Sequence, residues 1–381
     1  MKRKQNLEEL LCALVATMVA CGMDTERETA RAVNTQASES AGEENGQDEH
    51  IPKGILTHTV GPAATDPCDP GVSDQTPCIA TGLNDHVTWV DTSARRNQKL
   101  LVFMPGHGIP PKSYGLVQME AARAGYHVVG LAFANGTAAL AVACRVADPN
   151  ACFRDSRLEM LDGTPREHSV VHPGVPKSIY NLIPKLLQYL GKYYPEEGWS
   201  RFLRHGEPKW SRIAVGGHSL GGGQAALIAK SHLVARVVLF SAVPDSFSST
   251  AASAPWVSTD VTPANRYWGL AHQREPLFMP IHASWGLLGM TAFGGDKFPE
   301  NMEPPYDFTH MLVTNLAPHL PSQVPPLTPM GTDFHLSIAR DDRTPLGPDG
   351  TPSLTDAWRY LLTAQAGGDD EDRKDDSAED R

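Results

Sequence analysis

The sequence predicts an α/β fold, with a mostly parallel central sheet and helices on both faces. Short apolar runs such as residues 99–104 carry almost no charge, as expected of strands buried on both faces of a parallel sheet. They alternate with helical segments such as residues 178–194, whose apolar side chains recur every three to four positions. A Gly-His-Ser-Leu-Gly sequence, residues 217–221, joins one apolar run to the helix formers that follow it.

The N-terminus predicts an export signal over residues 1–21. Residues 2–4 are basic, and the apolar stretch 10–20 is too short to span a bilayer permanently. Residues 18–22, Met-Val-Ala-Cys-Gly, resemble a bacterial lipobox, in which Cys21 becomes the lipidated first residue. We therefore expect an exported, periplasmic or cell-surface protein held at the outer membrane by a lipid anchor. Ordinary cleavage, or the amphipathic N-terminal helix of a cytosolic protein, are the alternatives.

Residues 22–50 predict a flexible tether, because they are rich in Ala, Glu, Ser, Thr and Asn and nearly lack large apolar side chains. Residues 51–366 are predicted to form the folded domain, beginning with a Pro- and Gly-punctuated stretch at 51–82. Residues 367–381 are a charged tail expected to be disordered.

Length and charge limit the function further. The chain has 381 residues, 41% of them hydrophobic, enough for one large domain or two ordinary ones. Its net charge of −11 disfavours a nucleic-acid partner. The composition gives no indication of oligomeric state.

Four cysteines remain once the signal is removed, and an even number in an exported chain suggests two disulfides. Four cysteines allow three pairings, and we favour the two local ones. A metal site is not expected, because C-x-x-C spacings are absent. The favoured pairs are Cys68–Cys78 and Cys144–Cys152.

Strands and helices are predicted in alternation along the folded domain. The strands cover residues 86–90, 99–104, 126–132, 213–215, 234–241, 266–271 and 311–314. The helices cover residues 113–124 with Ser113 as N-cap, 178–194, 225–230, and 353–364 with Ser353 and Asp356 as a capping box. Two inserted loops are predicted to shape a pocket, at residues 135–176, where a small cap is the alternative, and at residues 276–305.

Residues 217–221 are typical of a nucleophile on a sharp strand-to-helix turn. Such a turn lifts the Ser219 hydroxyl out of the sheet, where a base can reach it. Its crowded backbone requires small neighbours, which Gly217 and Gly221 provide. A phosphate-cradling loop is the alternative, but no Lys follows at the P-loop position and the spacing does not fit a dinucleotide fingerprint.

A serine nucleophile needs a histidine base and an acid, which follow it in this type of fold in the order Ser, acid, His. His335 lies after the last strand and before the final helix, where the base belongs. His319 is the alternative, because His310 abuts a strand and is expected to be packed. Without a catalytic role, His335 or His319 would be an exposed loop histidine.

Glu275 is the favoured acid, because it follows the strand at 266–271, the usual position for this residue. Asp245, after the strand ending at residue 241, is the alternative. Asp260 and Asp296 lie in loops. Without a catalytic role, Glu275 would be a surface carboxylate paired with Arg274 or solvated.

Two backbone N–H groups are candidates for stabilising a developing oxyanion. One belongs to Leu220, directly after the nucleophile. The other belongs to His107, in the Gly-rich loop 105–108 after the strand at 99–104. The alternative for this loop is a simple turn.

At these residues the sequence resembles the α/β-hydrolase superfamily of serine hydrolases, and more narrowly a poorly characterised family of exported bacterial α/β-hydrolase-like lipoproteins. The resemblance covers roughly residues 85–365 and rests on residues 105–108, the two-cysteine insertion, residues 217–222 and the segment from His335 to residue 362. It implies the α/β-hydrolase fold, with Ser219 as nucleophile and His335 as base. The usual acid is Asp, so Glu275 departs from the pattern.

The expected function is hydrolysis of a small-molecule or lipid carboxylic ester through an acyl-enzyme. No cofactor is implied, because side chains alone carry this chemistry. A peptidase or amidase on the same fold is one alternative. A catalytically idle surface-binding lipoprotein is the other.

Overall fold

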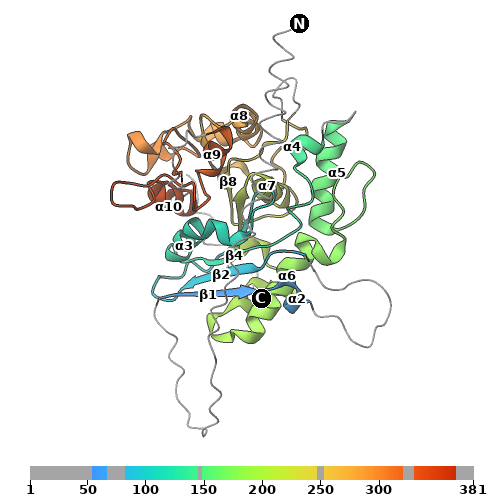
Figure 1. The fold of residues 1–381 in the computed structure, drawn as a ribbon. Helices are drawn as coiled ribbons and strands as arrows, with labels where there is room; N and C mark the ends of the chain where they lie inside the picture. The colour runs from blue at the N-terminus through green and yellow to red at the C-terminus, as the bar shows by residue number, and fades with distance from the viewer. Residues whose placement is uncertain (1–53, 67–81, 145–147, 247–252, 321–329, 366–381) are drawn as a thin grey trace, which may run out of the picture.

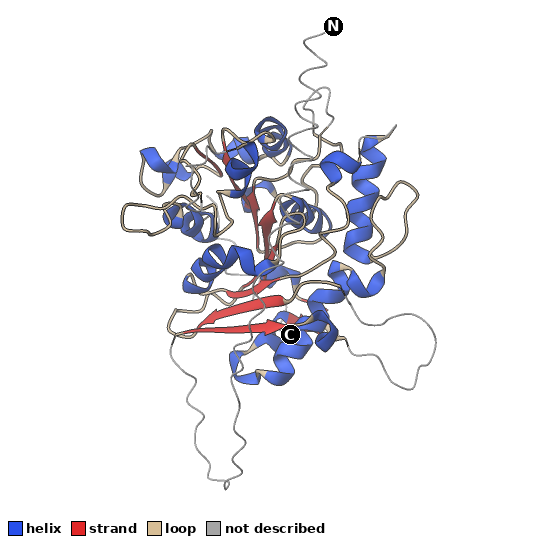
Figure 2. Cartoon of the chain, viewed as in Figure 1, coloured by secondary structure: helices blue, strands red, loops and turns tan. Residues whose placement is uncertain are grey.

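The computed structural model describes residues 54–66, 82–144, 148–246, 253–320 and 330–365. Within these residues one eight-stranded sheet carries helices on both of its faces, as Figure 1 and Figure 2 show. This confirms the predicted α/β class. Several predictions fall outside the described residues, namely the signal peptide with Cys21, the tether 22–50, the Cys68–Cys78 pair and the tail 367–381.

The sheet has the strand order of an α/β-hydrolase. Across the sheet it runs β1 (Ile55–Val60), β2 (His86–Asp91), β4 (His127–Gly130), β3 (Leu100–Met104), β7 (Ile213–His218), β8 (Arg236–Phe240), β9 (Tyr267–His272) and β10 (Met311–Thr314). The pairs β1–β2 and β2–β4 are antiparallel, and every later neighbour is parallel. Parallel strands end at the same edge, so the loops after β3, β7, β8 and β9 meet there.

Alternate side chains of the buried strands enter two separate cores. In β3, Leu100, Val102 and Met104 face one core, whereas Leu101 and Phe103 face the other. The first core is covered by α5 (Pro149–Asp162), α6 (Ile179–Tyr193), α7 (Leu220–Ser231) and α8 (Phe278–Leu287). The second is covered by α3 (Gly115–Arg123) and α10 (Thr355–Thr363). The remaining short elements are α2 (Pro62–Thr65), α4 (Leu140–Ala143), α9 (Gly331–Leu336) and the hairpin strands β5 (Leu203–Arg204) and β6 (Glu207–Pro208).

Helix α6 confirms the prediction from its apolar spacing. Its apolar stripe is buried against the sheet, although Pro184 lies inside the helix. The buried residues are Ile179, Leu182, Ile183, Leu186, Leu187 and Leu190. No helix among the described residues is both long enough and apolar enough to cross a bilayer.

The predicted helix caps are wrong. Ser113 lies in a 3₁₀ turn, and α3 starts at Gly115. Its first N–H groups donate instead to the carboxylate of Asp341, 2.9 Å from Gly115 N and 3.0 Å from Leu116 N. The cap is thus supplied by a residue far along the chain, which local sequence does not reveal.

Helix α10 also lacks its predicted capping box. It starts at Thr355, and its N-cap residue Leu354 makes no side-chain cap hydrogen bond. Leu354 is fully buried, so the start of this helix is fixed by packing into the second core. Ser353 precedes the N-cap and is held through its backbone N–H by the carbonyl of Pro345.

The two predicted loop insertions instead contain helices. Helices α4 and α5 lie in the first insertion and α8 in the second. Helix α5 has its own sequence signals: Asp148 accepts a bond from Ala151 N at 3.0 Å, Pro149 opens the helix, and Gly163 closes it with φ 75°. The Cys144–Cys152 disulfide joins the end of α4 to α5, which confirms this predicted pair.

Candidate active site

Ser219 is the single residue between the end of β7 and the start of α7. Its backbone has φ 52° and ψ −112°, a conformation that L-residues rarely adopt outside strained turns. Neighbouring segments hold it, since Ser219 N donates to Phe240 O at 2.9 Å and its carbonyl accepts from Gly223 N at 3.1 Å. The sequence thus folds into the predicted strand–turn–helix arrangement around Ser219.

Gly217 and Gly221 lie where a side chain would strike the end of β3. A Cβ on Gly217 would be 2.4 Å from the carbonyl oxygen of Met104, and one on Gly221 would be 2.0 Å from the same atom. Contacts this short cannot be relieved by a flexible side chain, because the obstacle is backbone. The glycines therefore allow the turn to pack against the β3 strand end.

Glu275 and His335 are brought together from segments 60 residues apart. His335 lies in the short helix α9, and its Nδ1 is hydrogen-bonded to Oε2 of Glu275, at the turn after β9. The other carboxylate oxygen, Oε1, accepts from Ser241 Oγ at 2.6 Å and from His272 N at 3.0 Å. Both residues are only 4% exposed. Because Nδ1 is the donor to Glu275, Nε2 of a neutral His335 is the nitrogen that can accept a proton.

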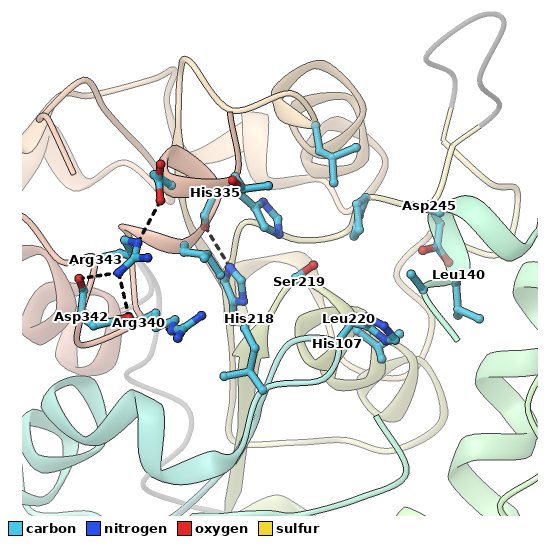
Figure 3. A pocket seen from close by; sticks show the side chains of 18 of the residues that line it. His107, Leu140, His218, Ser219, Leu220, Asp245, His335, Arg340, Asp342 and Arg343 are labelled. Carbon is cyan, nitrogen blue, oxygen red and sulfur yellow. Dashed lines mark hydrogen bonds and ion pairs between the residues drawn. The ribbon is translucent and has the colours of Figure 1, made fainter. Parts of the chain in front are cut away.

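His335 and Ser219 line one cavity of about 280 Å³ (Figure 3). The described residues contain no hydrogen bond between the Ser219 hydroxyl and the imidazole. Bonds of this kind are commonly long before substrate binds. The arrangement therefore brings the Ser219 hydroxyl and the His335 imidazole to a shared space, with the imidazole already oriented by Glu275.

The cavity wall combines apolar and charged side chains. The apolar side chains are those of Ile109, Ala139, Leu140, Ala141, Pro244, Leu277 and Leu336. Arg340, Asp342 and Arg343 lie together on the other side of Ser219 from Leu140 (Figure 3). Arg343 is paired with Asp333 at 2.9 Å and Asp342 at 2.8 Å, so this wall is polar without carrying a large net charge.

Asp245, the alternative acid, forms a buried ion pair with Arg157 of α5. The guanidinium donates from Nε at 2.5 Å and from Nη2 at 2.6 Å, and Trp256 Nε1 donates to the same carboxylate at 3.0 Å. These bonds use both carboxylate oxygens. Arg157 Nη1 also donates to the carbonyl of Leu220 at 3.0 Å, which ties α5 to the first residue of α7.

The other candidate histidines that follow Ser219 in the sequence do not line the cavity. His319 is exposed in a loop. His310 is packed between the rings of Trp268 and Phe293, with centroid distances of 4.4 and 4.2 Å. His282 pairs with Asp296 at 3.0 Å near the surface. Asp260 is exposed.

The two candidate oxyanion donors both belong to the cavity wall. Neither the His107 nor the Leu220 backbone N–H forms a hydrogen bond with another described residue. The loop that carries His107 is fixed by Asn135, whose amide donates to Gly106 O at 2.6 Å and to Ile109 O at 2.9 Å. Burial lowers the pKa of the His107 side chain.

Several residues that support this site could not be found from the sequence. Asn135 and Arg157 lie in the first insertion, and Ser241 ends the run predicted as a strand. Their partners are 26 to 88 residues away along the chain, so no local pattern points to them. The capping signals of α5 were readable, and they would have placed Arg157 on a helix.

Comparison with protein-family models and with curated proteins finds no match for this chain. The fold is established by the coordinates: an α/β protein with a mostly parallel central sheet in the strand order of an α/β-hydrolase. Among the described residues, no group of three or more His, Cys, Asp or Glu side chains is arranged to hold a metal ion.

Proposed function

We propose that this protein is a serine hydrolase that cleaves carboxylic esters through an acyl-enzyme on Ser219. The observation that carries the proposal is the hydrogen bond from His335 Nδ1 to Glu275, on the wall of the cavity that also holds Ser219. This is the pattern of nucleophile, base and orienting acid that activates a serine hydroxyl. The chemistry is carried by side chains and backbone amides alone.

In the proposed reaction, Ser219 Oγ attacks the ester carbonyl while Nε2 of His335 takes the hydroxyl proton. The buried Glu275 carboxylate stabilises the imidazolium that forms and fixes the ring orientation. Collapse of the tetrahedral intermediate breaks the bond to the alcohol, which leaves with the proton from His335. Water then attacks the acyl-enzyme by the same route and releases the carboxylic acid and free Ser219.

Charge on the tetrahedral oxygen needs donors that are already oriented. The Leu220 and His107 amides are available for this role, because no described residue accepts from them. The Leu220 amide also opens α7, so the positive end of the helix dipole adds to the stabilisation.

The cavity volume of about 280 Å³ suits a small-molecule ester or the reactive end of a lipid ester. We place the chain with the exported bacterial α/β-hydrolase-like lipoproteins that its motifs resemble. In this proposal Cys21 carries the lipid, and the enzyme works in the periplasm or at the cell surface while anchored to the outer membrane.

A fluorophosphonate probe tests the nucleophile. We expect the purified wild type to be labelled and Ser219→Ala to remain unlabelled. Ser231→Ala, at the far end of the same helix, is the matched control and should label as the wild type does. An unlabelled wild type, or equal labelling of Ser219→Ala, overturns the proposal and favours a catalytically idle binding protein.

A substrate series tests the reaction class. p-Nitrophenyl esters and the matched p-nitroanilides differ only in the leaving atom, so kcat/KM for the two series separates esterase from amidase. We expect turnover of the esters and at least a hundredfold lower kcat/KM for the anilides. Comparable values would assign a peptidase or amidase.

Radioactive palmitate tests the anchor in cells. The wild type and Cys12→Ser, a change within the same signal segment, should incorporate label, whereas Cys21→Ser should not. Incorporation that survives Cys21→Ser would rule out this lipidation site.

A further inference from the structure

His218, the residue before Ser219, is hydrogen-bonded to two groups of the site and reaches a third through Tyr114. The residue is only 1% exposed although it borders the cavity. Nε2 lies 2.9 Å from the carbonyl oxygen of His335, and Nδ1 lies 3.0 Å from the Tyr114 hydroxyl. The same hydroxyl is 3.1 Å from the backbone N of Gly106. Figure 3 shows the bond between His218 and the His335 backbone.

Only one arrangement of protons satisfies this chain of bonds. The His335 carbonyl can only accept, so His218 must carry its proton on Nε2. Nδ1 of the neutral ring then accepts the Tyr114 hydroxyl proton, which leaves the tyrosine oxygen to accept from Gly106 N–H. Each bond of the chain therefore has one direction, running from the Gly106 amide to the His335 carbonyl.

The electrostatic surroundings keep both side chains neutral. Burial, reinforced by the neighbouring His335, holds the pKa of His218 well below its usual value. Burial also raises the pKa of Tyr114 above its usual range. Neither an imidazolium nor a tyrosinate disturbs the chain of bonds at working pH.

The bond to His335 supplies something that α9 itself lacks. This carbonyl lies in the last turn of a short helix, and the amide four residues on, Ala339 N, donates to Leu336 O instead. His218 is thus the nearer of two side-chain donors to a carbonyl left over at the helix end, the other being Ser241 Oγ at 3.4 Å. The base has two anchors, Glu275 on its ring and His218 on its backbone.

At its other end the chain of bonds reaches the loop that carries His107, one of the two candidate oxyanion donors. Gly106 directly precedes His107, and a Cβ at position 106 would be 2.6 Å from His218 Nδ1 and 3.0 Å from the Tyr114 hydroxyl. The loop is therefore packed against the histidine as well as bonded through the tyrosine.

We propose that His218 is a positioning residue that sets the His335 base and the His107 oxyanion loop in register with Ser219. The inference rests on the proposed function, because it assigns a role within that reaction. His218 takes no proton from substrate. It acts by holding the backbone of one partner directly and that of the other through Tyr114.

Two amide substitutions separate the two halves of this role. In His218→Gln the amide nitrogen can reach the position of Nε2 and still donate to the His335 carbonyl. In His218→Asn the shorter amide reaches only the position of Nδ1, so it can accept from Tyr114 but leaves the carbonyl with only the long 3.4 Å bond from Ser241 Oγ. Tyr114→Phe removes the link to Gly106 alone. His205→Asn and His205→Gln, in the exposed β5–β6 turn, are the matched controls.

The measurement is kcat and KM for a p-nitrophenyl ester, expressed per active site titrated with the fluorophosphonate. We expect His218→Asn to lower kcat about a hundredfold with KM changed less than threefold, because a misplaced base costs rate rather than binding. His218→Gln should recover at least a tenth of the wild-type kcat. The two His205 controls should match the wild type.

Equal losses of kcat in His218→Asn and His218→Gln would overturn the proposal. So would variants in which fewer active sites can be titrated but kcat per site is unchanged. Either result would mean that His218 only stabilises the fold. A kcat within twofold of the wild type in both variants overturns it as well.

Amide hydrogen exchange distinguishes failure of the proposal for His218 from failure of the proposed hydrolase function. His218→Asn should speed exchange in α9 relative to His218→Gln even in a protein that hydrolyses nothing. If the fluorophosphonate does not label the wild type but α9 exchanges faster in His218→Asn than in His218→Gln, the proposed hydrolysis is wrong and the anchoring of α9 by His218 still holds. An unlabelled wild type without the contrast would remove both.

Discussion

The Glu275 carboxylate accepts hydrogen bonds from three donors, and only one of them is the His335 ring. The Ser241 hydroxyl and the His272 amide occupy the second oxygen, so the first is directed at His335. Every donor is buried, and the negative charge is compensated by these bonds instead of by water. A side chain of the same shape without the charge should therefore be a poor replacement.

Glu275→Gln should lower kcat for ester hydrolysis by roughly 10³–10⁴-fold. The amide has no charge to stabilise the imidazolium, and its NH₂ group must face the His335 ring N–H or the two donors on the other side. Steady-state turnover of a p-nitrophenyl ester measures the loss. Glu303→Gln, an exposed carboxylate, is the control. Activity within threefold of the wild type would remove Glu275 from the reaction.

Gly221→Ala should destabilise the fold by about 3 kcal/mol, because its methyl group would lie 2.0 Å from the Met104 carbonyl. Gly286 in α8 is the contrast, since a Cβ there meets nothing within 4 Å. Gly286→Ala should stabilise by about 0.5–1 kcal/mol through helix propensity. Urea unfolding measures both changes, and equal effects of the two would contradict the close approach at Gly221.

At the scale of elements, the start of one helix and the end of another are completed by distant side chains. The start of α3 is capped by Asp341, and the end of α9 is bonded by His218. Arg157 links α5 to the first turn of α7. Contacts of this kind fix each helix relative to the edge of the sheet where the site lies.

Asp341 makes the stability of α3 depend on pH. Burial raises its pKa to about 6, even though the Gly115 and Leu116 amides favour the charged form. A carboxyl whose pKa is higher in the folded state stabilises the fold at low pH, and the contribution is lost as pH rises from about 4 to 6. Asp341→Asn cannot ionise and should lose this dependence.

The comparison is the unfolding free energy of wild type minus that of Asp341→Asn, from urea titrations between pH 4 and 7. This difference should fall as pH rises to about 6 and then level off. Asp260→Asn, an exposed site, should track the wild type throughout. A difference that stays constant with pH would show that Asp341 ionises normally in the fold.

At the scale of the whole molecule, acid should unfold the protein through its buried histidines. Burial lowers the pKa of His86 to about 3 and those of His127 and His310 to about 4. The unfolded chain binds protons at these positions below about pH 6.5, whereas the folded state does not. Each of these histidines can therefore lower the free energy of unfolding by up to about 1.4 kcal/mol for each pH unit of acidification between pH 6.5 and 4.

Thermal unfolding at pH 7, 5.5 and 4.5 measures this effect. We expect Tm to fall steadily over this range, since the buried histidines with a lowered pKa outnumber the carboxyl groups with a raised pKa among the described residues, of which Asp341 is the example above. A Tm that stays constant or rises on acidification would mean that these imidazoles are charged in the native state.

The strands and the Ser219 turn could be predicted because they depend on local patterns. Apolar runs mark β3 and β7, and the order Ser, acid, His along the chain points to Glu275 and His335. β1 was missed, since its alternating residues Ile55–Val60 lie in a stretch punctuated by Pro and Gly. The links through Tyr114 and Arg157 join residues 104 and 88 positions apart, and only the folded sheet brings them together.

The Cys144–Cys152 bond has a practical consequence for making this protein. Helix α4 has only four residues, two of which, Leu140 and Ala141, line the cavity, and the covalent link fastens that helix to α5. Material produced in a reducing cytosol would lack the link, and its wall at Leu140 would be loose. Recombinant protein for substrate screening should therefore be secreted through an oxidising compartment or refolded in air, so that the pocket being screened keeps the Cys144–Cys152 link.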